Sequence, residues 1–216
     1  MLVSTIISNG LSLADTPNTN FFTASDQLFA VQLAYKELYA MLAEANDDYY
    51  VTQLYIPFAS FTADANRQFV YNYALPTDFY RLRLFQFLSD GPMYFPVAKM
   101  TIESFGNIQN GPGYRLVGQN LSLFTQVSYS TWAVWYYPAP ATLTTATEIV
   151  YPNSLLPEIM SYQLAIEVRR KQNLDVADKE MRKMQLISTM LKQLDRDEAR
   201  AESPRNSFSQ GFSPYI

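Results

Sequence analysis

A long, aromatic and sparsely charged middle segment, set between helical segments, is the feature that most restricts how this chain can fold. Residues 49–157 carry five basic and five acidic residues, although they make up half of the 216-residue chain. Phe, Trp and Tyr make up 15% of the whole sequence, and apolar and polar residues alternate along much of the middle segment. Alternation with a period of two indicates half-buried strands. The sequence therefore predicts a β-domain inside an otherwise helical protein.

One corner of this segment shows how its strands are joined. Residues 73–83 read as the end of a strand, a one-turn corner at Pro76 and the start of another strand. Proline fixes its own φ and holds the preceding residue extended. From residue 80 the types alternate, so Arg81 and Arg83 are expected on one face. Further strands are predicted at 51–58, 67–73, 80–88, 93–96, 114–117, 121–124 and 129–137, with one or two helical turns at 99–105.

Apolar residues spaced three and four apart predict helices on both sides of the β-domain. Thr23 or Ser25 is the expected N-cap of the strongest helix, and Asp26 suits its positive end. The predicted helices cover residues 2–13, 25–45, 154–172 and 174–201. We therefore predict an α+β fold, with an α-helical bundle, an inserted antiparallel β-domain and an extended C-terminal tail. The expected boundaries are 1–48 and 154–201 for the bundle, 49–153 for the β-domain and 202–216 for the tail.

The composition excludes several kinds of chemistry. The chain contains no Cys and no His, which removes disulfides, thiolate nucleophiles, Cys/His zinc sites and imidazole acid–base catalysis. The segment Gly111-Pro112-Gly113 lacks the lysine and the following helix of a phosphate-binding loop. Asp78, Asp90, Glu103 and Glu148 are scattered without the pattern of a glycosidase pair. We therefore expect neither an enzyme nor a cofactor.

Charge and hydropathy restrict the partners. The formal net charge is -4, which argues against binding that depends on neutralising nucleic-acid phosphates. No apolar run reaches the roughly 20 residues of a membrane-spanning helix, so no membrane partner is expected. The N-terminus lacks the basic start of a secretory signal, so a protein made in the cytoplasm is expected.

The middle segment carries fewer charges than the surface of a free monomer normally needs, which suggests that much of it contacts other protein. Arg81 and Arg83 are either part of a solvated strand face or partners of acidic residues in a neighbouring subunit. Trp132 and Trp135 lie three apart in a strand, so they point to opposite faces. They are further candidates for contact between subunits. One of them could instead be a sugar-stacking platform, which makes a carbohydrate-binding β-module the alternative.

The C-terminal residues 203–216 cannot continue the last helix. They set aromatic and apolar residues among flexible polar ones, a pattern that suits a segment which orders on a partner. A frayed terminus is the alternative. The candidate docking residues are Phe208, Phe212, Tyr215 and Ile216.

The order of these pieces resembles the head-to-tail adaptor, or connector, proteins of tailed bacteriophages. The similarity is greatest to adaptors with a β-domain inserted in a helical bundle, the tail tubular protein A type of short-tailed phages. It rests on the helix end at 38–50, the corner at 73–83, Tyr114-Arg115-Leu116-Val117-Gly118, Trp135-Tyr136-Tyr137-Pro138-Ala139-Pro140 and the charged C-terminal helix pair.

The resemblance implies a structural role without catalytic residues or cofactors. It implies a homo-oligomeric ring, usually of twelve copies, under the portal protein in the virion neck, after assembly in the host cytoplasm. Such a ring seals the DNA-filled capsid, continues the DNA channel without binding DNA specifically, and is the platform for tail, nozzle or tail-completion proteins. Related adaptors dock a C-terminal segment into the portal, and residues 203–216 stand at that position. The alternative β-module would belong to a phage tail or receptor-binding protein.

Overall fold

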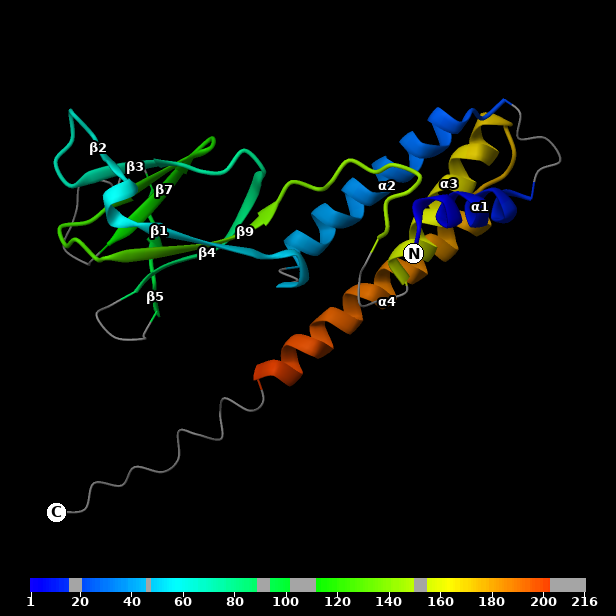
Figure 1. Cartoon of the computed structure of the whole chain (residues 1–216). Coiled ribbons are helices and arrows are strands. Elements are labelled where there is room, and N and C mark those ends of the chain that lie inside the picture. Colours follow the sequence, from blue (N-terminus) through cyan, green and yellow to red (C-terminus); the bar gives the residue numbers. More distant parts are fainter. Residues whose placement is uncertain (16–20, 46–47, 89–93, 102–111, 150–154, 203–216) are drawn as a thin grey trace, which may run out of the picture. The chain divides into compact units, whose positions relative to one another are not determined.

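The computed structural model describes residues 1–15, 21–45, 48–88, 94–101, 112–149 and 155–202. The chain separates into two compact units (Figure 1). One unit is helical and discontinuous, comprising Met1–Asp47 and Pro140–Ile216, and the other is the β unit Asp48–Ala139. The structure therefore has the α+β class predicted from the sequence. The predicted tail at 203–216 lies outside the described residues.

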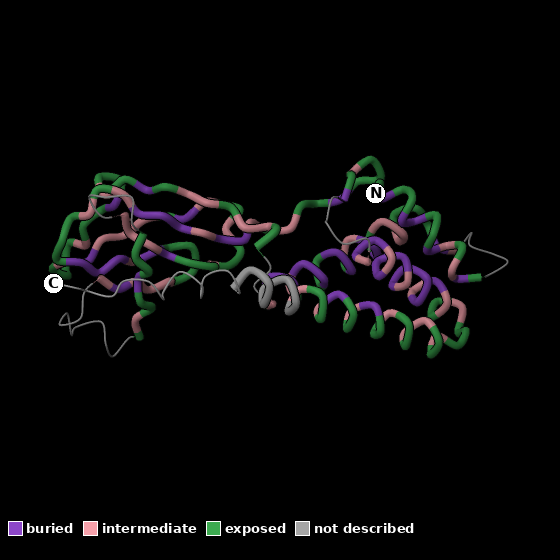
Figure 2. The backbone as a smooth tube through the Cα atoms, turned by 90° about the horizontal axis from the view of Figure 1, so that it is seen from below, coloured by how far each residue is buried: buried purple, intermediate pink, exposed green. Residues whose placement is uncertain are grey.

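The helical unit is built around one central helix. It contains α1 (Val3–Ala14), α2 (Ala24–Glu44), α3 (Leu155–Lys171) and α4 (Ala177–Glu202). Each of α1, α2 and α4 packs against α3. Ten residues of α3 are buried, and their positions lie on more than one side of the helix. Figure 2 shows buried residues of the chain in purple. The three neighbours of α3 explain why this helix is buried on more than one side.

A close approach of α1 to α3 depends on Gly10. A Cβ atom built on Gly10 would lie 2.9 Å from the carbonyl oxygen of Ser161 and 2.8 Å from Cδ2 of Leu164. Ser161 also donates a hydrogen bond of 3.2 Å from Oγ to the carbonyl oxygen of Ile6. Because glycine has no side chain, the two helix backbones can approach this closely. This role of Gly10 is not predictable from the sequence, because its contact residues on α3 lie about 150 positions away.

The predicted end of the β-domain at residue 153 falls later than the structural division at Pro140. The Thr-rich segment 140–149 packs on the helices instead of extending a sheet. The backbone N–H of Val3 donates to the carbonyl oxygen of Thr147 at 3.0 Å, and that of Ile149 donates to the carbonyl oxygen of Met1 at 2.9 Å. The side chain of Gln32 on α2 donates to the carbonyl oxygen of Ala141 at 3.2 Å. The partners of this segment are far away in the sequence, so local pattern did not reveal them.

Helix α2 begins with a complete capping box, which confirms Thr23 as the N-cap. The backbone N–H of Asp26 donates to Thr23 Oγ1 at 3.2 Å, and that of Thr23 donates to Asp26 Oδ2 at 3.0 Å. Lys171 Nζ lies 3.1 Å from the same carboxylate oxygen. The Lys171 hydrogen bond, then those from Thr23, hold the pKa of Asp26 below its ordinary value. The stabilisation from this ionised carboxylate is therefore complete above the ordinary pKa and is lost as pH falls through the lowered one.

Removal of the cap should destabilise the helical unit. Thr23→Ala leaves the backbone N–H of Asp26 without its acceptor, and the expected loss is about 1 kcal/mol of unfolding free energy. Urea denaturation followed by circular dichroism at a helix wavelength measures it. The matched control is Thr189→Ala, an exposed threonine within α4 whose hydroxyl donates only to the carbonyl oxygen of Gln185 at 2.9 Å. Equal losses for the two variants would contradict the role of the cap.

The β unit consists of two sheets. One has the strand order β1-β9-β4-β5 and the other β2-β3-β8-β7-β6. All pairings are antiparallel except that of β6 with β7, which is parallel. Helical turns were predicted at 99–105, but Lys99 is in strand β6, and residues 102–105 lie outside the described residues. The strands are β1 (Thr52–Pro57), β2 (Thr62–Ala63), β3 (Val70–Ala74), β4 (Phe79–Leu88), β5 (Tyr94–Pro96), β6 (Ala98–Lys99), β7 (Gly113–Val117), β8 (Asn120–Phe124) and β9 (Thr131–Pro138).

The core of the β unit lies between these two sheets. Ile56, Phe85 and Trp132 enter it from the four-stranded sheet, and Leu121 and Leu123 enter it from the five-stranded sheet; all five are fully buried. Aromatic residues of the middle segment therefore fill the core of a β-sandwich.

The corner predicted at Pro76 is present between β3 and β4, where the N–H of Phe79 donates to the carbonyl oxygen of Pro76 at 3.0 Å.

Candidate interaction surface on the β unit

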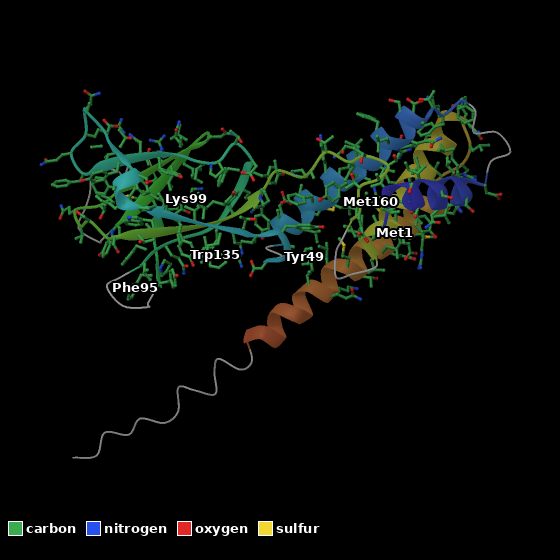
Figure 3. All side chains as sticks on the ribbon, viewed as in Figure 1. Met1, Tyr49, Phe95, Lys99, Trp135 and Met160 are labelled. Atoms are coloured by element: carbon green, nitrogen blue, oxygen red, sulfur yellow. The ribbon has the colours of Figure 1, made fainter. Side chains whose placement is uncertain are left out.

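Strand β9 divides the aromatic residues of the middle segment between two environments. Trp132, Val134 and Tyr136 belong to the core cluster. Trp135 alternates with them and lies on the side of the sheet away from β3 and β7 (Figure 3). The prediction that Trp132 and Trp135 point to opposite faces is confirmed.

Trp132 is the centre of the sandwich core. Its side chain is 0% exposed. Its ring stacks on Phe85 at 5.3 Å between centroids and also contacts Phe61, Phe87 and Tyr129. A residue buried in this way cannot touch another subunit or a sugar, so the prediction of Trp132 as a contact residue is wrong. The alternation of β9 was compatible with either tryptophan facing inward, and the position of the second sheet decided between them.

The outer face of the four-stranded sheet exposes apolar and aromatic side chains. Strand register places Tyr55 opposite Ala133, Ala133 opposite Gln86, and Gln86 opposite Pro96, so these residues share that face. The exposed fractions are 52% for Tyr55, 37% for Leu84 and 41% for Tyr94, and Trp135 is half-buried. We call this set the outer sheet surface: Tyr55, Leu84, Gln86, Tyr94, Ala133 and Trp135.

Hydrogen bonds hold the side chains of the outer sheet surface in place. The hydroxyls of Tyr55 and Tyr94 are 3.3 Å apart, although their strands, β1 and β5, are the two edges of the sheet. The two side chains therefore reach across β9 and β4, and Ala133 beneath them is only 1% exposed. Trp135 Nε1 donates to Gln86 Oε1 at 3.2 Å. The hydrogen bond with Tyr55, and then desolvation, raise the pKa of the Tyr94 hydroxyl above its ordinary value.

The two arginines predicted as contact residues lie at one end of this sheet. Arg81 pairs with Tyr137 in the strand register and is exposed. Arg83 is also exposed, and its Nε lies 3.0 Å from Asp48 Oδ1 of the same chain. The predicted acidic partner in a neighbouring subunit is therefore not needed to explain Arg83. An exposed pair of this kind contributes little stability, and both arginines stay candidates for contact.

No group of three or more carboxylates that could hold a metal ion occurs in the described part of the chain. Within the same ranges, no helix is both long and apolar enough to cross a membrane. The predicted docking residues Phe208, Phe212, Tyr215 and Ile216 lie outside the described residues. The outer sheet surface is thus the candidate site of the β unit.

Sequence reasoning did not find Tyr55, Leu84 or Tyr94. Alternation in residues 52–57 and 79–88 could have assigned Tyr55 and Leu84 to one face of their own strands. It could not show that β1 and β5 lie on either side of β9 and β4, which is what gathers these residues into one surface.

No family model matches the chain, and no curated protein matches it.

Proposed function

We propose that this protein is a structural head-to-tail adaptor of a tailed bacteriophage, which forms a ring beneath the portal protein. The observation that carries the proposal is the outer sheet surface. Its residues Tyr55, Leu84, Gln86, Tyr94, Ala133 and Trp135 are all uncharged, and three of them are large, apolar and exposed. Tyrosine and tryptophan are enriched in protein interfaces, and charged residues are depleted at interface centres.

The chemistry of this surface suits contact better than catalysis. Its polar groups are two tyrosine hydroxyls, one amide and one indole N–H, and they bond with one another. No carboxylate lies among them to act as a general acid or a nucleophile. A preorganised surface of rigid aromatic side chains loses little conformational entropy when a partner binds.

The ring would join the portal protein above to tail, nozzle or tail-completion proteins below, and DNA would pass through it. The net charge of -4 agrees with a channel that does not hold DNA. Twelve copies are the expected number, and residues 203–216 are the segment proposed to dock into the portal. These features come from the family resemblance of the sequence.

A pair of charges on the outer sheet surface should prevent assembly. In Tyr55→Glu/Leu84→Glu, two carboxylates would be buried at the contact without partners, which costs several kcal/mol. At least a tenfold loss of rings on portal particles is expected by negative-stain electron microscopy. The control Gln119→Glu/Asn120→Glu adds the same charge at exposed positions of the β7–β8 turn region and should assemble normally. Unchanged ring yield in the first variant, with its circular dichroism intact, would remove the outer sheet surface from the assembly.

The alternative is sugar binding by the β unit, and the outward Trp135 beside Tyr55 favours it. Burial of Trp132 removes one of the two platforms on which that alternative depended. A glycan array separates the two functions. Binding that Trp135→Ala abolishes would support a carbohydrate-binding module, whereas an array without hits and rings on portal particles would exclude it.

A further inference from the structure

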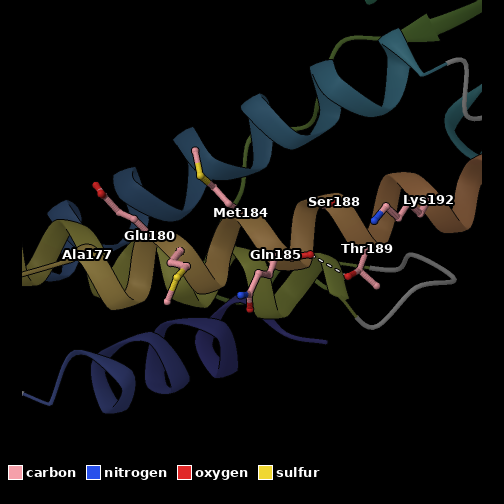
Figure 4. Close-up of a pocket in the computed structure, with 8 residues that line it drawn as sticks. Ala177, Glu180, Met184, Gln185, Ser188, Thr189 and Lys192 are labelled. Atoms are coloured by element: carbon pink, nitrogen blue, oxygen red, sulfur yellow. Dashed lines mark hydrogen bonds between the residues drawn. The ribbon is translucent and has the colours of Figure 1, made fainter.

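Helix α4 carries an apolar seam on the side that faces away from α3. Leu186 and Met190 are buried and face the bundle. On the opposite side, exposed residues recur at intervals of four, three and four. Met181 is 61% exposed and Met184 is 73% exposed. Both line an open pocket along α4, whose lining residues Figure 4 shows as sticks. We call these residues the α4 seam: Ala177, Met181, Met184 and Ser188.

Helix α2 carries a second seam with the same intervals. Val31, Leu38 and Leu42 are buried in the bundle. On the other side of the helix, Phe29 is 69% exposed and Leu33 is 42% exposed. We call these residues the α2 seam: Phe29, Leu33, Lys36 and Ala40.

We propose that the α2 seam of one copy packs on the α4 seam of the next copy. Intervals of four and three place residues along one line of a helix, the spacing with which two helices interlock. The seams also match in size. The α2 seam offers the rigid, bulky side chains of Phe29 and Leu33, whereas the α4 seam offers small residues and two flexible methionines that adapt their shape to a partner.

Charge favours this pairing over the pairing of either seam with itself. Helix α2 has three carboxylates (Asp26, Glu37 and Glu44) and one lysine, Lys36. The opposite balance holds for the part of α4 that carries the seam, residues 177–194, whereas the whole helix has equal numbers of cations and anions. The charged residues of this part are the cations Lys179, Arg182, Lys183 and Lys192 and the anions Asp178 and Glu180. Among the described residues, Glu37, Glu44 and Lys192 make no ion pair within the chain. Opposite charges attract across an α2–α4 contact and like charges repel across an α2–α2 or α4–α4 contact.

A contact between two different faces of the same chain has a consequence for assembly. Each copy keeps one free α2 seam and one free α4 seam, so copies add in one direction and form a ring or a filament. Helices α2 and α4 run in the same direction in the helical unit (Figure 1), so neighbours with similar orientations would pair them as parallel helices. This inference rests on the proposed ring and names the helical contact that builds it.

Cysteine cross-linking tests the contact, because the natural chain contains no Cys. Leu33→Cys and Met184→Cys replace exposed residues, one in each seam, and circular dichroism checks that the variants fold. A short bismaleimide should link a mixture of the two variants into dimers and leave each variant alone as monomer. The chain that carries both cysteines should give a ladder of dimers, trimers and larger products. The control mixture, Ser8→Cys on the exposed side of α1 with Met184→Cys, should stay monomeric.

Several results would overturn the proposed contact. Dimers from either variant alone would show a seam pairing with itself. No dimers from the mixture, or equal amounts from the control mixture, would show that the seams do not meet. Rings seen by electron microscopy without any cross-linked ladder would contradict the α2–α4 contact and still support the adaptor function. A cross-linked ladder from a protein that is absent from virions would support the α2–α4 contact and contradict the adaptor function.

Discussion

Trp132→Ala is expected to lower the unfolding free energy of the β unit by about 3–5 kcal/mol, the usual loss when a buried tryptophan is truncated. The side chain is 0% exposed and contacts four aromatic rings, so its removal leaves a cavity where both sheets meet. Chemical denaturation followed by near-ultraviolet circular dichroism, which reports aromatic packing, measures the loss. Because a domain has only about 5–15 kcal/mol of stability in total, partial unfolding at room temperature is an expected outcome.

Two further variants make this prediction specific. Trp135→Ala removes the same side chain from the half-buried outer face and should cost less than half as much. Trp132→Phe keeps a ring in the core and removes an indole N–H that has no hydrogen-bond partner among the described residues, so it should also cost less than Trp132→Ala. A larger loss from Trp135→Ala than from Trp132→Ala would mean that the core has been assigned to the wrong face of the sheet.

Gly10→Val is expected to push α1 away from α3 and to lower the unfolding free energy of the helical unit by about 3 kcal/mol. This value is at the upper end of the usual loss when a side chain is added to a well-packed core. Even a single Cβ atom would lie 2.9 Å from the carbonyl oxygen of Ser161. That oxygen belongs to the backbone of the central helix, so it cannot move aside as a flexible side chain could. Thermal unfolding followed at a helix wavelength should show a lower midpoint.

The matched control for Gly10→Val is Ser8→Val, which places the same side chain on an exposed position of the same helix. Its effect should stay within about 0.5 kcal/mol, the usual range for surface substitutions. If both variants lost the same stability, the cause would be the low helix propensity of valine and not the contact between α1 and α3.

Much of the fold was predictable because the sequence patterns that indicate its helices and strands involve residues close together in the chain. The threonine cap of α2, the three-and-four spacing of apolar residues in the helices and the alternation around Trp132 each depend on neighbours within a few residues. The paths of residues 140–149 and of strand β6 were not predictable. Thr147 accepts a hydrogen bond from Val3, and Ala98 pairs with Gly113 in a sheet. These partners are distant in the sequence, and no local pattern predicts them.

The candidate surfaces likewise include features that local sequence predicts and features that depend on distant residues. Alternation alone placed Trp132 and Trp135 on opposite faces of their strand, but the position of the second sheet decided that Trp135 is the one that faces outward. The outer sheet surface needed the order of four strands, because Tyr55 and Tyr94 come from opposite edges of the sheet. Apolar residues spaced three and four apart predicted the helix that became α4, but this spacing does not tell which of its residues face α3. The structure shows that Met190 is buried and that Met184 is exposed.

The central claim is that this chain is a ring-forming adaptor, and its location in purified virions tests that claim most directly. Electron cryomicroscopy of tailed phage particles that carry this protein should show it as a ring of identical copies between the portal and the tail. The two units described above should fit into the density of each copy. Density for the chain at a tail fibre or receptor-binding tip, or its absence from the neck of the particle, would contradict the claim.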